Sequence, residues 1–284
     1  MNFILNERSL HGQFESVEDF LESLSANLKC FGLVRQQAEG KIRKLADFYK
    51  CQVTSDITLG ELKQYPRTDE LLRMRIAFDK EMKTEPYWDL APVHNYGIQY
   101  WMNGEDVSAT ALAEAAAREE GLLSFDSKIY KDQKLTIQQN ETIHEVISVY
   151  HPRYLVECFE KQMGLGRNIC LKARYDGTRL DCSVLEESYG ADILEKEEYR
   201  QLLGTLDKFV RHDSWETIDL DDGLEYKKYT PASEEEDWFR GGEYGDLTIM
   251  KFRFSGKMRC FGYRKGERFR LLRIERDHKK SNKG

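Results

Sequence analysis

The C-terminal stretch 247–275 constrains the fold of this chain more than any other part of its sequence. Apolar and basic residues alternate along 247–254, which is the two-residue period of a β-strand with one buried face. Gly256 and Gly266 mark two tight turns between three such runs. The pattern predicts a three-stranded antiparallel meander, with a bulge near 271–272, where the apolar residues change phase.

The charge of the chain is distributed very unevenly. The formal net charge is −7, yet residues 251–284 contain 13 Lys and Arg against three Asp and Glu. Residues 184–246, directly before them, contain 19 acidic and seven basic side chains. An acidic segment therefore precedes a basic sheet. This asymmetry predicts either an anionic partner for the sheet, such as nucleic acid, or ion pairing between the two segments.

The remaining sequence predicts an α+β fold in two parts. We expect a mostly helical N-terminal domain over 1–150 and an α/β domain over 151–284, which ends in an acidic segment (213–246) and the basic meander (247–280). Within 213–246, the aromatic residues Trp215, Tyr226, Tyr229, Trp238 and Phe239 predict that this segment docks on a core. From apolar spacing and caps we expect helices at 16–28, 33–49, 69–83, 109–120, 151–163 and 192–212, and strands at 2–5, 122–125, 134–138, 145–150, 168–173 and 180–185.

Composition excludes several protein classes. An apolar fraction of 40% and an aromatic fraction of 12% exclude a wholly disordered chain. No apolar run approaches the roughly 20 residues of a membrane helix, and the apolar run at 3–5 is too short for a signal peptide. We therefore expect a cytoplasmic protein with no membrane partner. The six cysteines form no CxxC pair and no HExxH motif occurs, so we expect reduced thiols and no metal or other cofactor.

The basic meander is the best candidate for a nucleic-acid surface. Strand alternation places Arg259, Phe261 and Tyr263 on one face, and cations beside aromatic rings are typical of proteins that bind phosphates and unpaired bases. Two alternatives remain open: the acidic segment neutralises the sheet internally, or the basic surface is merely solvated. The residues expected to bind nucleic acid are Lys251, Arg253, Phe261, Tyr263, Arg264, Arg268 and Arg270.

The segment 275–280 places His278 beside an acid and several cations. Such a histidine can transfer protons next to a phosphate, whereas the alternative interpretation is a charged, frayed terminus.

The meander and its tail, KFRFSGKMRCFGYRKGERFRLLRIERDHKK, are similar in layout to bacterial toxin ribonucleases of the RelE/HigB-like superfamily. The resemblance implies metal-free RNA cleavage, in which the 2′-hydroxyl attacks the adjacent phosphate and cations stabilise the charged transition state. By position, Lys251 and Arg253 match the basic first strand. Arg259, Arg273 and His278 match the catalytic residues, with His278 as terminal acid or base. The chain departs from that family in its length and in having 213–246 where a helical hairpin normally precedes the sheet.

The N-terminal half gives weaker signals. Its segments FILNERSLHGQFES, EPYWDL and TALAEAAAREEGLLSF resemble uncharacterised proteins from bacterial phage-defence neighbourhoods, to which no activity can be attached. Its carboxylates offer an alternative, a Mg²⁺-dependent nuclease centre, although solvated surface acids are the simpler interpretation. These carboxylates are Glu85, Asp89, Glu105, Asp106, Glu114, Asp126 and Glu141.

The functional hypothesis from the sequence is a nucleic-acid-directed effector, a ribonuclease of toxin or phage-defence type that acts on RNA rather than DNA. The alternatives are a nucleic-acid-binding module without catalysis and a protein-interaction component whose acidic segment and basic sheet close on each other or on a second copy.

Overall fold

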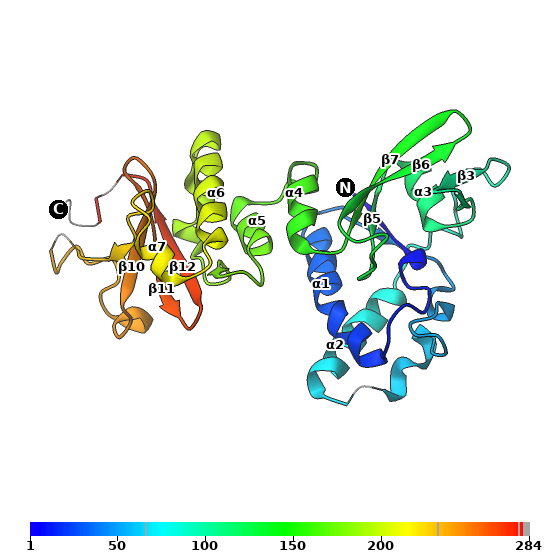
Figure 1. The fold of residues 1–284 in the computed structure, drawn as a ribbon, viewed down its shortest axis with the longest axis horizontal. Coiled ribbons are helices and arrows are strands. Elements are labelled where there is room, and N and C mark those ends of the chain that lie inside the picture. The colour runs from blue at the N-terminus through cyan, green and yellow to red at the C-terminus, as the bar shows by residue number, and fades with distance from the viewer. Residues whose placement is uncertain (66, 232, 278, 281–284) are drawn as a thin grey trace. The chain divides into compact units, whose positions relative to one another are not determined.

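The structure, a computed structural model, describes residues 1–65, 67–231, 233–277 and 279–280. The fold is α+β, as predicted, and the chain divides into two compact units, Met1–Leu165 and Gly166–Gly284 (Figure 1). The boundary lies beyond the predicted one at residue 150, because the helix that follows residue 151 belongs to unit 1. In that helix the Phe159 ring packs edge-on against Phe3, with 5.1 Å between the ring centres.

Unit 1 is built on a seven-stranded mixed sheet of order β2-β1-β5-β7-β6-β3-β4. The first four strands in this order run parallel, and the remaining pairs are antiparallel. Three 3-10 helices lie at Glu7–Ser9, Phe48–Lys50 and Leu59–Gln64. The other elements are β1 (Phe3–Leu5), α1 (Val17–Arg35), β2 (Ile42–Arg43), α2 (Asp69–Met82), β3 (Tyr100–Met102), β4 (Glu105–Asp106), α3 (Ala111–Arg118), β5 (Gly121–Leu123), β6 (Gln133–Gln139), β7 (Thr142–Val149) and α4 (Pro152–Met163).

Helices cover both faces of this sheet. The alanine-rich α3 packs on one face, where its apolar side chains form a core with Ile4, Leu122 and Val146. On the other face, α4 contacts Phe3, and α1 reaches the sheet through Asn27, whose side-chain amide donates to the Ser124 carbonyl at 2.8 Å. The β6–β7 hairpin projects beyond the short neighbouring strand β5 (Figure 1).

Three sequence predictions for these regions need correction. The N-terminal part is not simply a mostly helical domain, because helices and a seven-stranded sheet share it. The helix expected at 33–49 is wrong: α1 ends at Arg35, and Ile42–Arg43 pairs parallel with β1, a long-range contact that local periodicity does not report. The strand expected at 168–173 is the helix α5 (Arg167–Arg174), which buries Asn168 and Leu171 on one side.

Unit 2 contains a five-stranded sheet of order β8-β12-β11-β10-β9. Strands β10, β11 and β12 follow one another in the chain, and each pairs antiparallel with the next. Phe261 faces Arg273 and Gly262 faces Leu271, so Leu272 is the extra residue of a bulge at the predicted position. Besides α5, the elements are β8 (Leu180–Asp181), 3-10 helices at Glu187–Tyr189, Ala191–Ile193 and Gly242–Tyr244, α6 (Lys196–Arg211), α7 (Trp215–Asp219), β9 (Lys227–Lys228), β10 (Ile249–Ser255), β11 (Met258–Lys265) and β12 (Arg268–Glu275).

The two faces of the unit 2 sheet are covered differently. One face packs on α6, where Phe209 stacks on Phe252 with 5.0 Å between the ring centres. The other face carries Lys251, Arg253, Arg259 and Arg270 and is partly covered by part of the acidic segment. We call this part the aromatic cover; its side chains Tyr229, Trp238, Phe239 and Tyr244 pack around Phe261 and Leu272. The prediction that the aromatic residues of 213–246 dock on a core is confirmed: Tyr229, Trp238 and Phe239 pack here, and Trp215 and Tyr226 pack with the core on the α6 face.

None of the helices in the described part of the chain combines the length and the apolar character needed to cross a lipid bilayer.

Candidate functional site

The candidate site lies on the covered face of the unit 2 sheet, where side chains from three strands form cross-strand rows. Arg253, Arg259 and Glu275 occupy directly opposed positions on β10, β11 and β12. Opposed residues of an antiparallel sheet share a face, as do residues two positions apart along one strand. Lys251 therefore lies on the same face as this row. We call Lys251, Arg253, Arg259, Glu275 and the neighbouring Glu225 the Lys251 cluster.

Lys251 is the most unusual cation of the sheet. Only 3% of its surface is exposed, and its amine has no hydrogen-bonded or ion-paired partner among the residues that the structure describes. Burial lowers the pKa of Lys251 below the ordinary lysine value, and the nearby charges of Lys227 and Arg259 lower it further, whereas the charges of Glu275 and Glu225 oppose the shift. A lysine in this state releases its proton more readily than a solvated one, which is what a general base needs.

The pKa of Glu275 is shifted in the opposite direction to that of Lys251. The residue is 4% exposed, and its Oε2 atom has no hydrogen-bond partner within the described residues. Burial raises the pKa of Glu275, whereas hydrogen bonds from the backbone N–H groups of Lys280 and Lys279 oppose the shift. A carboxyl group whose pKa is raised and an amine whose pKa is lowered thus lie on one sheet face. Opposite pKa shifts of this kind are typical of acid–base sites.

Two arginines flank these groups and share one carboxylate. Arg253 Nη1 lies 2.7 Å from Glu225 Oε1, and Arg259 Nη2 lies 3.7 Å from Glu225 Oε2. Arg259 also donates to the carbonyls of Gly256 and Met258, which fixes the direction of its guanidinium. The two guanidinium groups converge on one anion, the geometry that binds a carboxylate or a phosphate.

Arg273, an expected catalytic residue, has a different environment from Arg259. Its Nε lies 2.6 Å from Glu186 Oε1, and it also donates to the Trp238 carbonyl. Its guanidinium carbon lies 4.7–5.6 Å from the ring centres of Tyr189, Trp238, Phe239 and Tyr244. Arg273 therefore anchors the aromatic cover on the sheet.

The other arginines expected to bind nucleic acid also have acidic neighbours. Arg268 and Arg270 lie 3.8 and 3.6 Å from one oxygen of Asp181, and Arg264 lies 3.1 Å from Glu267. Asp181 is buried, and Arg268 and Arg270 help to lower its pKa. Much of the basic charge of the sheet is thus compensated within unit 2, as one of the alternatives left open by the sequence predicts.

The two aromatic residues expected to stack on bases are placed differently. Phe261 is fully buried against Tyr229, Trp238 and Phe239, so it presents no exposed ring face. Tyr263 is half-buried and lines a pocket of about 370 Å³ together with Trp215, Tyr226 and Arg264. In that pocket the Arg264 guanidinium lies over the Trp215 ring, 4.3 Å from its centre.

His278, the third expected catalytic residue, lies outside the described residues. The alternative of a metal-dependent centre in the N-terminal half gains no support, because the described residues contain no group of three or more His, Cys, Asp and Glu placed to hold a metal ion. Glu114 instead accepts hydrogen bonds from His94 and Arg118, and Asp89 accepts one from the backbone of Ala46.

Sequence reasoning missed Glu225 as part of the site. The only signal for it was the general acidity of 213–246, and its position on the two arginines results from a loop that no strand or helix pattern predicts. The sequence also suggested Lys251 only as a phosphate ligand. The burial that changes its acidity becomes visible only once the sheet and its cover are assembled.

Comparison with known proteins does not add a family: no protein-family model matches the chain, and neither curated proteins nor solved structures give a match.

Proposed function

We propose that unit 2 is an RNA-directed module and that the Lys251 cluster binds a phosphodiester and cleaves it without a metal ion. The observation that carries this proposal is the position of Lys251, which is 3% exposed, has no hydrogen-bonded or ion-paired partner among the described residues, and shares a sheet face with two arginines and the carboxyl group of Glu275. The resemblance of the meander to RelE/HigB-like toxin ribonucleases supports the same reaction class.

The roles follow from the acidity of the groups. The neutral amine of Lys251 removes the proton of a ribose 2′-hydroxyl, and the oxygen attacks the adjacent phosphorus. The bond from phosphorus to the 5′-oxygen breaks, and the protonated carboxyl of Glu275 gives its proton to that oxygen. The products are a 2′,3′-cyclic phosphate and a free 5′-hydroxyl. One proton is taken up and one released, and no oxidant or metal is required.

Arg253 and Arg259 bind the non-bridging phosphate oxygens in this proposal. Their guanidinium groups already converge on the Glu225 carboxylate, so they are arranged for an anion before any ligand arrives. Fixed donors stabilise the extra negative charge that develops on the phosphate in the transition state. The phosphate has to displace the Glu225 carboxylate from the two arginines.

A second candidate function is a protein-interaction component without catalysis. The observation that favours it is the pairing of Arg264, Arg268, Arg270 and Arg273 with acids of unit 2. A sheet neutralised in this way needs no polyanion. The two candidates differ in what Lys251 does, because it removes a proton in the first and only packs within the sheet in the second.

The test is cleavage of an end-labelled single-stranded RNA by the full chain in EDTA, comparing wild type with Lys251→Met. The matched control is Lys257→Met, which makes the same change at an exposed turn position of the same sheet. We expect Lys251→Met to lose cleavage by at least about 100-fold, the range typical of a lost general base, while Lys257→Met stays near wild type. Equal cleavage by both variants would remove Lys251 from the site.

Binding and cleavage are separated with the same RNA carrying 2′-O-methyl groups. We expect it to bind with a similar affinity and to stay intact, because the attacking hydroxyl is blocked. Wild-type protein that binds RNA but never cleaves it would support the non-catalytic alternative. Protein that neither binds nor cleaves RNA at low salt would support the protein-interaction alternative.

A further inference from the structure

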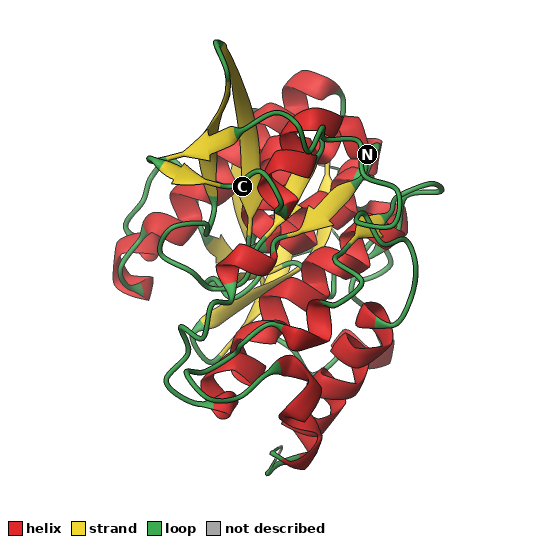
Figure 2. Ribbon diagram, turned by 90° about the vertical axis from the view of Figure 1, so that its right-hand side faces the viewer, coloured by secondary structure: helices red, strands yellow, loops and turns green. Residues whose placement is uncertain are grey.

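In the part of the chain that the structure describes, one edge of strand β7 is unpaired along most of its length. On one side β6 pairs with β7 from Thr142 to Ser148, whereas on the other side β5 pairs with it only through Ser148 and Val149. Within the residues that the structure describes, no strand pairs with this second edge over 142–147. The hairpin therefore presents an unpaired length of strand beside a folded core (Figures 1 and 2).

The register shows which backbone groups point outward along this edge. The Ser124 N–H donates to the Val149 carbonyl at 2.7 Å, so Val149 turns its peptide groups toward β5. In an antiparallel pair, alternate residues turn their N–H and C=O groups to the same side. Ile147, Glu145 and Ile143 therefore turn theirs away from β6. The pairing of Leu122 with Ser148 uses the Ile147 carbonyl, which leaves three N–H donors and two C=O acceptors in a row. Such a row is a template for an added strand.

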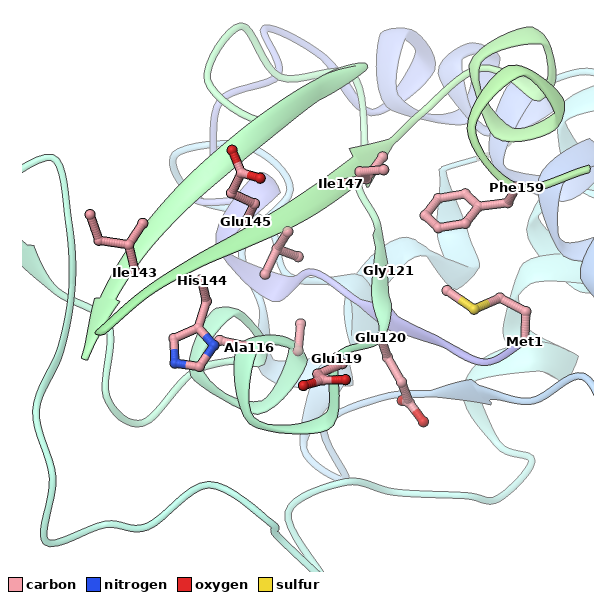
Figure 3. Close-up of a pocket in the computed structure, with 12 residues that line it drawn as sticks. Met1, Ala116, Glu119, Glu120, Gly121, Ile143, His144, Glu145, Ile147 and Phe159 are labelled. Carbon is pink, nitrogen blue, oxygen red and sulfur yellow. The ribbon is translucent and has the colours of Figure 1, made fainter. Parts of the chain in front are cut away.

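The edge opens onto a pocket of about 350 Å³ (Figure 3). Leu122 lies opposite Ser148, so a longer β5 would place residues 117–120 opposite 143–146. The chain is instead helical up to Arg118, and Glu119 turns it with a positive φ of 56°. The pocket thus lies where the line of β5 would continue. Ala116, Gly121 and Phe159 contribute an apolar part of its wall.

Three acidic side chains line the pocket, besides Met1. Glu119, Glu120 and Glu145 line it, and the carbonyl end of α3 adds a partial negative charge. Glu120 pairs with Arg43 and Glu145 with Lys134, but the described residues offer Glu119 no ion-pair partner. On the outer face of the hairpin Ile143 is 66% exposed. A complementary strand would be apolar on one face and basic on the other.

We propose that the β7 edge binds an extended, basic segment of a partner polypeptide as an additional strand, alongside residues 143–147. Backbone hydrogen bonds supply the affinity, as in other β-augmentation sites, and a Lys or Arg directed at Glu119 supplies selectivity. A second copy of this chain fits less well. Two-fold antiparallel pairing centred on Glu145 would set the two Glu145 carboxylates directly opposite each other, which is destabilising. This inference does not depend on the proposed function of unit 2.

The test uses the full chain and a fluorescently labelled, capped peptide, Val-Lys-Val-Lys-Val-Lys. We expect saturable binding and, in hydrogen exchange, a slowing of about tenfold or more for the amides within 142–147. The same peptide with N-methylated valines, which cannot donate from these positions, is expected to bind at least about tenfold more weakly. A Val-Glu peptide of the same length is expected to bind weakly, because its charge matches that of the pocket.

Two variants at Glu145 distinguish the contribution of its backbone N–H to binding from that of its side chain. Glu145→Pro removes an outward N–H and none of the hydrogen bonds to β6, so we expect a loss of binding of about tenfold or more. Glu145→Gln keeps that N–H and is expected to bind within a few-fold of wild type. The proposal is wrong if 142–147 gains no protection at millimolar peptide, or if the N-methylated peptide binds as well as the parent. The second criterion holds even where Glu145→Pro fails to fold.

Discussion

Glu225 Oε1 lies 2.7 Å from Arg253 Nη1, and the second oxygen of the same carboxylate lies 3.7 Å from Arg259 Nη2. Glu225 belongs to the loop between α7 and β9 and has a positive φ of 47°, which is uncommon for a residue other than glycine. The carboxylate therefore occupies the position between two guanidinium groups that a phosphate takes in the proposed reaction. An internal anion at a phosphate site competes with the substrate.

The first prediction follows from this competition. Glu225→Gln removes the competing charge, so we expect the affinity for single-stranded RNA to rise about two- to five-fold, as for a loss of 0.5–1 kcal/mol of a partly exposed ion pair. Fluorescence anisotropy of a labelled RNA at fixed salt measures this. The matched control is Glu267→Gln, which removes an acid paired with Arg264 at an exposed turn. Unchanged or weaker RNA binding by folded Glu225→Gln would contradict the account of this carboxylate.

The second prediction concerns Arg273 as the anchor of the aromatic cover. Arg273→Met removes the ion pair with Glu186 and the contacts with four aromatic rings. We expect unit 2 to lose about 2–4 kcal/mol of stability toward urea, because Glu186 is left without its cation. Arg268→Met is the control, since its side chain is 42% exposed and its loss should cost under about 1 kcal/mol. Equal urea midpoints for the two variants would show that the cover does not depend on Arg273.

The third prediction uses two glycines of unit 2 in opposite roles. A Cβ atom at Gly262 would lie 2.0 Å from the Arg270 carbonyl oxygen and 2.8 Å from the Phe269 ring, beside the bulge of β12. Gly262→Ala should therefore destabilise unit 2 by about 2 kcal/mol or more through overpacking. A Cβ at Gly204, inside α6, would meet nothing within 4 Å. Gly204→Ala should stabilise by about 0.5–1 kcal/mol, as expected in a helix.

Thermal unfolding of both alanine variants checks this pair. A Gly262→Ala protein as stable as wild type would mean that β11 and β12 approach each other less closely than described.

The fourth prediction is a pH dependence of stability that is caused by Glu7, a residue of unit 1. Burial raises the pKa of Glu7 to about 7, although the N–H of Ala111 donates to its carboxylate and opposes the shift. The folded state therefore holds this proton more tightly than the unfolded state. The stabilising contribution of this Glu7 proton is complete below about pH 4.5 and is lost as pH rises through about 7. Its upper bound is about 3 kcal/mol.

Glu7→Gln is expected to flatten the fall in stability between pH 5 and 8 and to make the variant more stable than wild type at pH 8. Urea unfolding followed at several pH values measures this difference. Parallel pH profiles for wild type and variant would exclude Glu7 as the titrating group.

The sequence predicts some elements of this fold much better than others. The alternation over 247–275 marks β10, β11 and β12 and places the bulge, because hairpins depend on neighbouring residues. The sheet of unit 1 was not predicted as one structure. Its strands β2, β3, β4 and β5 have only two or three residues each, and β2 and β5 pair with β1 across 39 and 118 positions of the chain.

The candidate site shows the same limit. Sequence alternation places Arg259, Phe261 and Tyr263 on one face of their strand. It does not distinguish Arg259, near the Lys251 amine, from Arg273, which is enclosed by aromatic rings. That difference arises because the acidic segment folds back over part of the sheet, a tertiary contact with no local signal.

The most direct test of the central claim is the product of a reaction in EDTA. Wild-type full-length protein is incubated at several pH values with a single-stranded RNA and with the same oligonucleotide in DNA form, and the products are analysed by mass spectrometry. The account predicts cleavage of the RNA alone, leaving 2′,3′-cyclic phosphate ends. RNA that stays intact at every pH, with protein shown to be folded by circular dichroism, would contradict it.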